Sequence, residues 1–286
     1  MRRRAIALGA VAVLAAAAMV AGCGDDDDEE ADATATDATT EESSGGGRAL
    51  TAPAASITVD GDSSDWQDIE ALEVDMEAIE GSDVPSKQGT VRVAHDDESV
   101  YVLFEVNDDY NWDQSDAHLS GSSAVMWNVE GPAGPHMGAE ADAGTPSTGM
   151  VDLWHWELEC AAGEESGGAA NGPGDGDPGN DGTCNFDDEW ATDAFTREDD
   201  NGPNAENSLS GVWTHSSPDA DAEGTWIFEA SRPLTTGDDQ DAQLAVGETS
   251  QLALAYWDPD NAPEGWSAPD HAQTSHEGWI DVTIAE

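Results

Sequence analysis

Apolar and polar residues alternate along much of the chain, in short runs separated by Gly, Asp and Pro. The clearest case is GTVRVAHDDESVYVLFEVNDD, where Val91 and Val93 alternate before a polar turn and Val102, Phe104 and Val106 alternate after it. A period of two is typical of a strand with one buried face, and two such runs around a short polar turn predict a hairpin.

Further strands are predicted in SSAVMWNVEG, MVDLWHWELE, GTWIFEASRPL, SQLALAYWD and GWIDVTI. No long stretch shows the apolar spacing of an amphipathic helix. Many short strands between turn residues predict an all-β fold, and a β-sandwich in particular.

Residues 160–210 interrupt this rhythm with Gly- and Asp-rich sequence, and we interpret them as an insertion. Cys160 and Cys184 lie inside it, and a lone cysteine pair in an exported protein favours a disulfide. Closing this loop is worth about 3–4 kcal/mol in the chain-entropy description. Covalent haem attachment is excluded because the chain has no Cys-x-x-Cys-His motif.

The insertion also offers hard oxygen ligands for calcium. The candidate ligands are Asp175, Asp177, Asn180 and Asp181. Their spacing does not match the twelve-residue helix–loop–helix calcium loop. In a chain this acidic, a solvated loop is the simpler interpretation.

The N-terminus is typical of an exported lipoprotein. Arg2–Arg4 precede a short apolar run, and Val20-Ala21-Gly22-Cys23 is similar to the bacterial lipobox, in which Cys23 is lipidated. The sequence predicts a signal peptide at 1–22, a disordered acidic tether at 23–54, and a lipid anchor on the extracytoplasmic face of the membrane. The alternative is a plain signal peptide with a chance cysteine.

The charge balance is extreme, with 8 Lys and Arg against 62 Asp and Glu in 286 residues, a formal net charge of -54. Such a chain repels nucleic acid and anionic membrane surfaces, so both are excluded as electrostatic partners. The acidic surface indicates a halophilic or salt-tolerant habitat, where salt screens the repulsion.

No motif of a catalyst is present: there is no G-x-S-x-G, no H-E-x-x-H and no phosphate-binding glycine loop. This argues against a hydrolase. The more informative pair is His136-Met137, which lies in a Gly/Pro loop. The Met137 thioether is a soft ligand that suits haem iron. The plainer alternative is a loop methionine without a ligand role.

Three other histidines carry weaker signals. His155 alternates with Trp154 and Trp156, so it points to the opposite face of its strand, where a structural role is expected. His271 and His276 precede the last strand. They are either surface residues or ligands that reach the Met137 loop.

The order of these segments resembles a known family. ITVDGDSSDW followed by VRVAHDDESVYVLFEVNDD is similar to the opening of family-nine-type carbohydrate-binding modules and of related haem-binding domains. HMGAEADAGTPSTGMVDLWHWELE resembles the Met-Gly loop and Trp-rich strand of the ethylbenzene dehydrogenase gamma-subunit type. WIFEASRPLTTGDDQDAQLAVGETSQLALAYWD and SHEGWIDVTI resemble that family's later segments, so the likeness covers about residues 55–286.

The resemblance implies a β-sandwich of the carbohydrate-binding-module or DOMON-like type that holds one non-covalent b-type haem. It implies electron transfer, often beside an iron–sulfur subunit and a molybdopterin oxidoreductase of the dimethyl sulfoxide reductase type. The family's axial ligands are a Met from the Met-Gly loop, matched by Met137, and a Lys near the C-terminal strand. The chain's single lysine, Lys87, is far from that strand, so His271 or His276 is the expected replacement.

Trp127, Trp154 and Trp156 are the candidates to wall the porphyrin. The rival function is a carbohydrate-binding lipoprotein, because eleven tryptophans on a sandwich suit sugar stacking. Acidic residues near Trp112 and Trp266 would then bind hydroxyls or calcium. A haem-free structural or solute-sensing domain is a third alternative.

Overall fold

The computed structural model describes residues 48–79, 82–113, 117–137, 149–158, 167–169, 185–193, 196–199, 208–219, 221–262, 265, 267 and 270–286. The signal peptide, the lipobox Cys23, the candidate disulfide Cys160–Cys184 and Trp266 lie outside these residues. The candidate calcium ligands of the insertion lie outside them as well.

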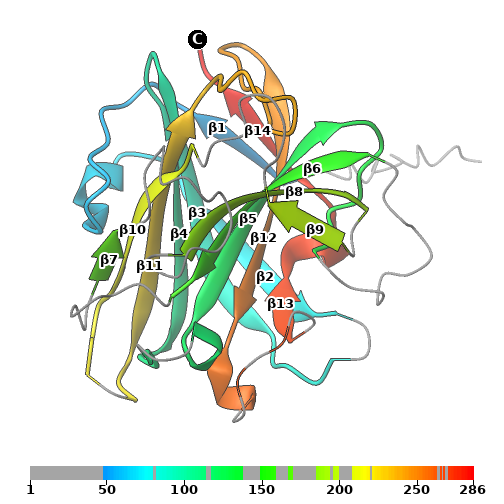
Figure 1. Cartoon of the computed structure of the whole chain (residues 1–286). Coiled ribbons are helices and arrows are strands. Elements are labelled where there is room, and N and C mark those ends of the chain that lie inside the picture. The colour runs from blue at the N-terminus through cyan, green and yellow to red at the C-terminus, as the bar shows by residue number, and fades with distance from the viewer. Residues whose placement is uncertain are drawn as a thin grey trace, which may run out of the picture. The chain divides into compact units, whose positions relative to one another are not determined.

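The described residues form strands joined by turns and single-turn 3₁₀ helices (Figure 1). The strands are β1 (Ala49–Ala52), β2 (Leu72–Ala78), β3 (Lys87–His95), β4 (Ser99–Asp109), β5 (Ser122–Glu130), β6 (Met150–Glu157), β7 (Gly167–Ala169), β8 (Asn185–Asp193), β9 (Thr196–Asp199), β10 (Ser210–His215), β11 (Glu223–Pro233), β12 (Thr249–Trp257), β13 (His271–Gln273) and β14 (Ile280–Ile284). The 3₁₀ helices are η1 (Ser63–Trp66), η2 (Ala117–Leu119), η4 (Pro259–Asn261) and η5 (Thr274–Glu277). The predicted all-β class is confirmed.

The strands are hydrogen-bonded in the order β7-β10-β11-β4-β3-β2-β13-β12-β5-β6-β8-β9, with β14 paired to β12 and β1 paired to β14. The main core contains side chains from both halves of this order: Phe104 of β4 and Phe228 of β11 pack with Trp127 of β5 and Trp154 of β6. The two halves therefore face each other across one core, which is the predicted sandwich. The hairpin predicted from the alternating valines is β3–β4.

The motif ITVDGDSSDW has a structural role. Glu229 of β11 is buried and accepts hydrogen bonds from the main chain of Asp60 and Gly61 and from the indole of Trp66, which donates at 2.7 Å. Three donors hold this carboxylate, and the carboxylate in turn fixes the N-terminal loop against β11.

Two predicted boundaries are corrected. β1 lies inside the predicted tether 23–54, and its Leu50 and Ala52 are buried. A four-residue strand with two apolar residues is too short for the alternation to stand out. The predicted insertion 160–210 contains strands β7, β8 and β9, and β8 pairs with β6 over seven residue pairs. Three consecutive acidic residues, Asp187, Asp188 and Glu189, are buried in β8 and concealed that strand.

Candidate functional site

A second cluster of buried apolar residues lies on the face of β5, β6 and β12 that points away from the main core. We call it the outer-face cluster; it consists of Ala124, Met126, Ala133, Met137, Val151, Leu153, Ala191, Ala253, Ala255 and Trp257. Strand alternation produces it, because Val125 and Trp127 of β5 point into the main core while Ala124 and Met126 point outward.

The centre of this face is made of small side chains. Ala124 of β5 pairs with Ala255 of β12, and Ala253 lies two residues further along β12. A single methyl group rises little above a sheet, and we call these three positions the alanine floor; Met126 pairs with Ala253 and His155 with Ala124 on the same face. Larger side chains, above all Met137 and Trp257, stand around it.

Met137 is held on this face by the far end of the chain. Its side chain is buried, and its main-chain N–H donates to Oε1 of Gln273 at 2.7 Å. The indole of Trp279 donates to the main-chain oxygen of Ala133 at 3.1 Å, four residues before Met137. The Met137 loop is thereby fastened to β13 and to the entry of β14.

His271 lies on the same face. On β13, His271 pairs with Trp257 and Gln273 pairs with Ala255, so all four side chains share one side of the sheet. The His271 imidazole is buried, and its ring centroid is 4.6 Å from that of Trp257. The structure therefore brings Met137 and His271 to one buried surface.

His276 is placed differently. It is in η5, its side chain is 28% exposed, and its Nε2 lies 3.9 Å from a carboxylate oxygen of the exposed Glu77. It takes no part in the outer-face cluster. The sequence left His271 and His276 as equal candidates, and burial separates them.

Trp127, Trp154 and Trp156 are not brought together with Met137. All three are buried in the main core, on the opposite face of the sheet. Trp127 and Trp154 have ring centroids 5.7 Å apart, and Trp156 stacks on Phe186 at 4.1 Å. The aromatic ring beside His271 among the described residues is Trp257, which the sequence did not single out.

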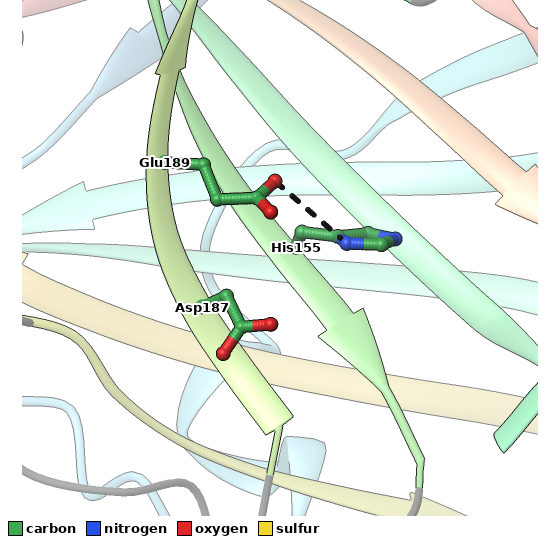
Figure 2. Close-up of side chains that lie close together, drawn as sticks. All are labelled: His155, Asp187 and Glu189. Carbon is green, nitrogen blue, oxygen red and sulfur yellow. Dashed lines mark ion pairs between the residues drawn. The ribbon is translucent and has the colours of Figure 1, made fainter. Parts of the chain in front are cut away.

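A polar group lies at another point of the outer face, shown in Figure 2. His155 of β6 lies opposite Asp187 of β8, and its Nδ1 is 3.8 Å from Oε2 of Glu189. One ligand atom from each of the three lies within 4.8 Å of the others, and all three residues are buried. The His155 ring is also 5.2 Å from Trp257. The acidic background of the sequence hid Asp187 and Glu189, although their spacing of two residues places them on one face.

Lys87 is bound elsewhere. Its Nζ lies 2.7 Å from Asp108 and 2.6 Å from Asp258, and 5.9 Å from the centroid of Tyr256. Burial lowers the pKa of Lys87, but the hydrogen bonds to Asp108 and Asp258 outweigh it, and the net shift is upward. The Lys87 ammonium therefore forms ion pairs with the two carboxylates of Asp108 and Asp258.

The sequence model of the ethylbenzene dehydrogenase family matches residues 63–268, most of the folded part of the chain. The chain belongs to the ethylbenzene dehydrogenase family. The match includes Met137 and Trp257 and ends just before His271. Within the family match lie both the Met-Gly loop and the floor of alanines described above.

Solved structures of carbohydrate-binding proteins show a distant likeness to this family member. A family 9 carbohydrate-binding module from Caldicellulosiruptor kristjanssonii is 10% identical in its glucose complex, with a TM-score of 0.41 over 83% of this chain and 95% of the module. A Bacteroides uniformis protein described as carbohydrate-binding is 10% identical, with a TM-score of 0.44 over 82% of this chain and 99% of that one. Similarities at this level carry no argument about what the chain binds. No curated protein matches the chain.

The part of the chain that the structure describes contains no helix that is long and apolar enough to cross a membrane.

Proposed function

We propose that this ethylbenzene dehydrogenase family member is a b-type cytochrome domain, with one non-covalent haem on the outer-face cluster between Met137 and His271. The observation that carries the proposal is the hydrogen bond from Met137 to Gln273. Gln273 is two residues from His271, so this bond holds the main chain of Met137 beside the strand that carries the His271 imidazole.

The residues present fit such a group. A Met sulfur and a His nitrogen are axial ligands that haem iron accepts in cytochromes. The alanine floor and the Trp257 ring supply apolar groups of the kind that contact a porphyrin. Gln273 orients Met137 without being a ligand. Haem bound here supplies a one-electron carrier, and two protein ligands leave no position for a substrate, which favours electron transfer over catalysis.

The setting of this domain is part of the proposal. Lipidation of Cys23 would tether it to the extracytoplasmic face of the membrane, and the family resemblance favours an iron–sulfur or molybdopterin oxidoreductase as the redox partner. The net charge of -54 favours a partner with a basic docking surface.

The test is an ultraviolet–visible titration of the exported chain with haemin, recorded before and after dithionite. We expect one haem per chain and sharp reduced α and β bands. Met137→Ala and His271→Ala should each convert the spectrum to a five-coordinate form and shift the reduction potential. His276→Ala is the matched control, and its spectrum should equal that of the wild type.

No bound haem above the level of free haemin would overturn the proposal. In that case, retention of the chain on immobilised glycans would support the carbohydrate-binding alternative. If the six-coordinate haem spectrum were lost in His276→Ala and unchanged in His271→Ala, the second ligand would be His276 of η5.

A further inference from the structure

A second group of carboxylates lies inside the sandwich, on the side of β6 and β8 opposite His155. Asp152 of β6, Asp188 of β8 and Asp241 of the segment after β11 each place one oxygen within 4.8 Å of the other two. Their exposed fractions are 0%, 0% and 2%. Three carboxylates in so dry an environment need compensating charge.

Among the described residues, the guanidinium of Arg232 contacts this group and supplies one positive charge. Arg232 of β11 is buried and donates through Nη1 to Oδ2 of Asp152, and the same nitrogen lies 3.5 Å from Oδ1 of Asp241. Its Nη2 donates to the main-chain oxygen of Ala242 at 2.6 Å. Three negative charges and one positive charge leave the group with a formal charge of minus two.

Asp152 and Asp188 each accept hydrogen bonds through only one of their two carboxylate oxygens. Asp152 Oδ2 also accepts from the main-chain N–H of Ala242 at 2.8 Å, and Asp188 Oδ2 accepts from the N–H and the hydroxyl of Ser208, both at 3.0 Å. In each case Oδ1 is buried and accepts no hydrogen bond from the described residues. Neither oxygen of Asp241 accepts one.

We propose that Asp152, Asp188 and Asp241 form a binding site for one divalent cation of the calcium type. Each of the three residues offers an oxygen without a donor, and Arg232 and Ser208 orient two of the carboxylates from behind, as supporting residues around metal ligands do. A divalent ion neutralises the group. Oxygen-only donors select a hard cation over zinc or copper.

Asp238 lies three residues before Asp241 in the same segment. It is buried, its Oδ1 accepts from the N–H of Gln240 at 2.8 Å, and its Oδ2 accepts no hydrogen bond among the described residues. Asp238 and Asp241 belong to the segment between β11 and β12, whereas Asp152 and Asp188 belong to β6 and β8. A cation held by Asp152, Asp188 and Asp241 therefore joins β6 and β8 to the segment between β11 and β12.

The experiment uses the full chain after exhaustive EDTA treatment, in 1 M NaCl to suppress loose binding to the acidic surface. Calcium is titrated by calorimetry, and terbium, a calcium substitute, is followed by luminescence excited through tryptophan; Trp154 lies 5.1 Å from the Arg232 guanidinium. We expect one saturable site and a rise in the melting temperature on calcium addition.

Asp241→Asn should weaken calcium at least tenfold, and Asp188→Asn is the second variant because its amide oxygen keeps the Ser208 hydrogen bonds. Asp239→Asn is the matched control in the same segment, since Asp239 is exposed. No saturable site in the wild type, or equal affinity in Asp241→Asn, Asp188→Asn and Asp239→Asn, would overturn the proposal. Haem titration of the same variants separates the two sites, because the carboxylates lie on the inner face and their loss should leave the haem spectrum unchanged.

Discussion

Met137 and Gln273 are joined by a buried hydrogen bond although 136 positions separate them in the sequence. The bond runs from a loop before β6 to the short strand β13. It decides which side of the sheet the Met137 loop covers, and it places that loop next to His271 and Trp257.

Replacing Gln273 by Ala should leave the Met137 N–H buried without an acceptor. A buried donor without a partner costs about 1–3 kcal/mol, so the free energy of unfolding should fall by that amount. Haem should also dissociate faster because the Met137 loop is less fixed. Urea denaturation and haem transfer to apomyoglobin measure the two effects.

Gln88→Ala is the control for that variant. Gln88 is exposed and donates to Asp75, so its loss should change both quantities little. Equal effects of Gln273→Ala and Gln88→Ala would contradict the role assigned to the Met137–Gln273 bond.

Lys87→Met tests whether the single lysine serves the haem or the fold. Its ammonium lies between Asp108 and Asp258, and without it these two buried carboxylates repel each other. We expect a loss of stability in thermal unfolding and an unchanged reduced haem spectrum. An altered α band would show that Lys87 contacts the iron.

Arg232→Met should be among the most destabilising single changes in the chain. The side chain is buried, and its removal leaves Asp152, Asp188 and Asp241 without their cation. Breaking a buried pair on one side costs about 3–5 kcal/mol. Denaturation with and without 10 mM calcium checks this, and calcium should recover part of the loss.

The stability of the calcium-free chain should fall as the pH rises from about 4 to above 6. The pKa of Asp152 is about 6 in the folded chain against an ordinary value of 3.8, and the pKa of Asp188 is raised in the same direction. In that window the folded state holds more protons than the unfolded state, so proton loss disfavours folding. Urea midpoints across the window measure the slope, which Asp188→Asn should reduce. A slope of opposite sign in the calcium-free chain would refute the assignment.

The sequence was sufficient to assign strand faces where apolar and polar residues alternate without interruption. Trp154 and Trp156 on one face and His155 on the other follow from the period of two, and the structure confirms these faces. The Met137 loop was singled out because methionine is unusual among glycines and prolines. The choice between His271 and His276 needed the structure, since only pairing with Trp257 shows which one is buried.

Charge concealed the remaining features. β8 reads as a solvated stretch because Asp187, Asp188 and Glu189 are consecutive, yet all three are buried. In a chain with 62 acidic residues, a carboxylate inside the core cannot be told from one on the surface. The acidic background also concealed Asp152, Asp188 and Asp241 around Arg232. In addition, these three residues come from three separate segments of the chain, so their proximity cannot be read from the sequence.

The parallel pairing of β1 with β14 has a consequence for the order of folding. Arg48, next to β1, donates to the main-chain oxygens of Thr274 and Gly278, the latter 230 positions away. Such contacts form only after almost the whole domain has been synthesised, and long-range pairings of this kind slow folding. Because η5 and β13 are adjacent in the chain, the region around His271 would gain its final support in one of the last folding steps. The proposed ligands Met137 and His271 would therefore be brought together late.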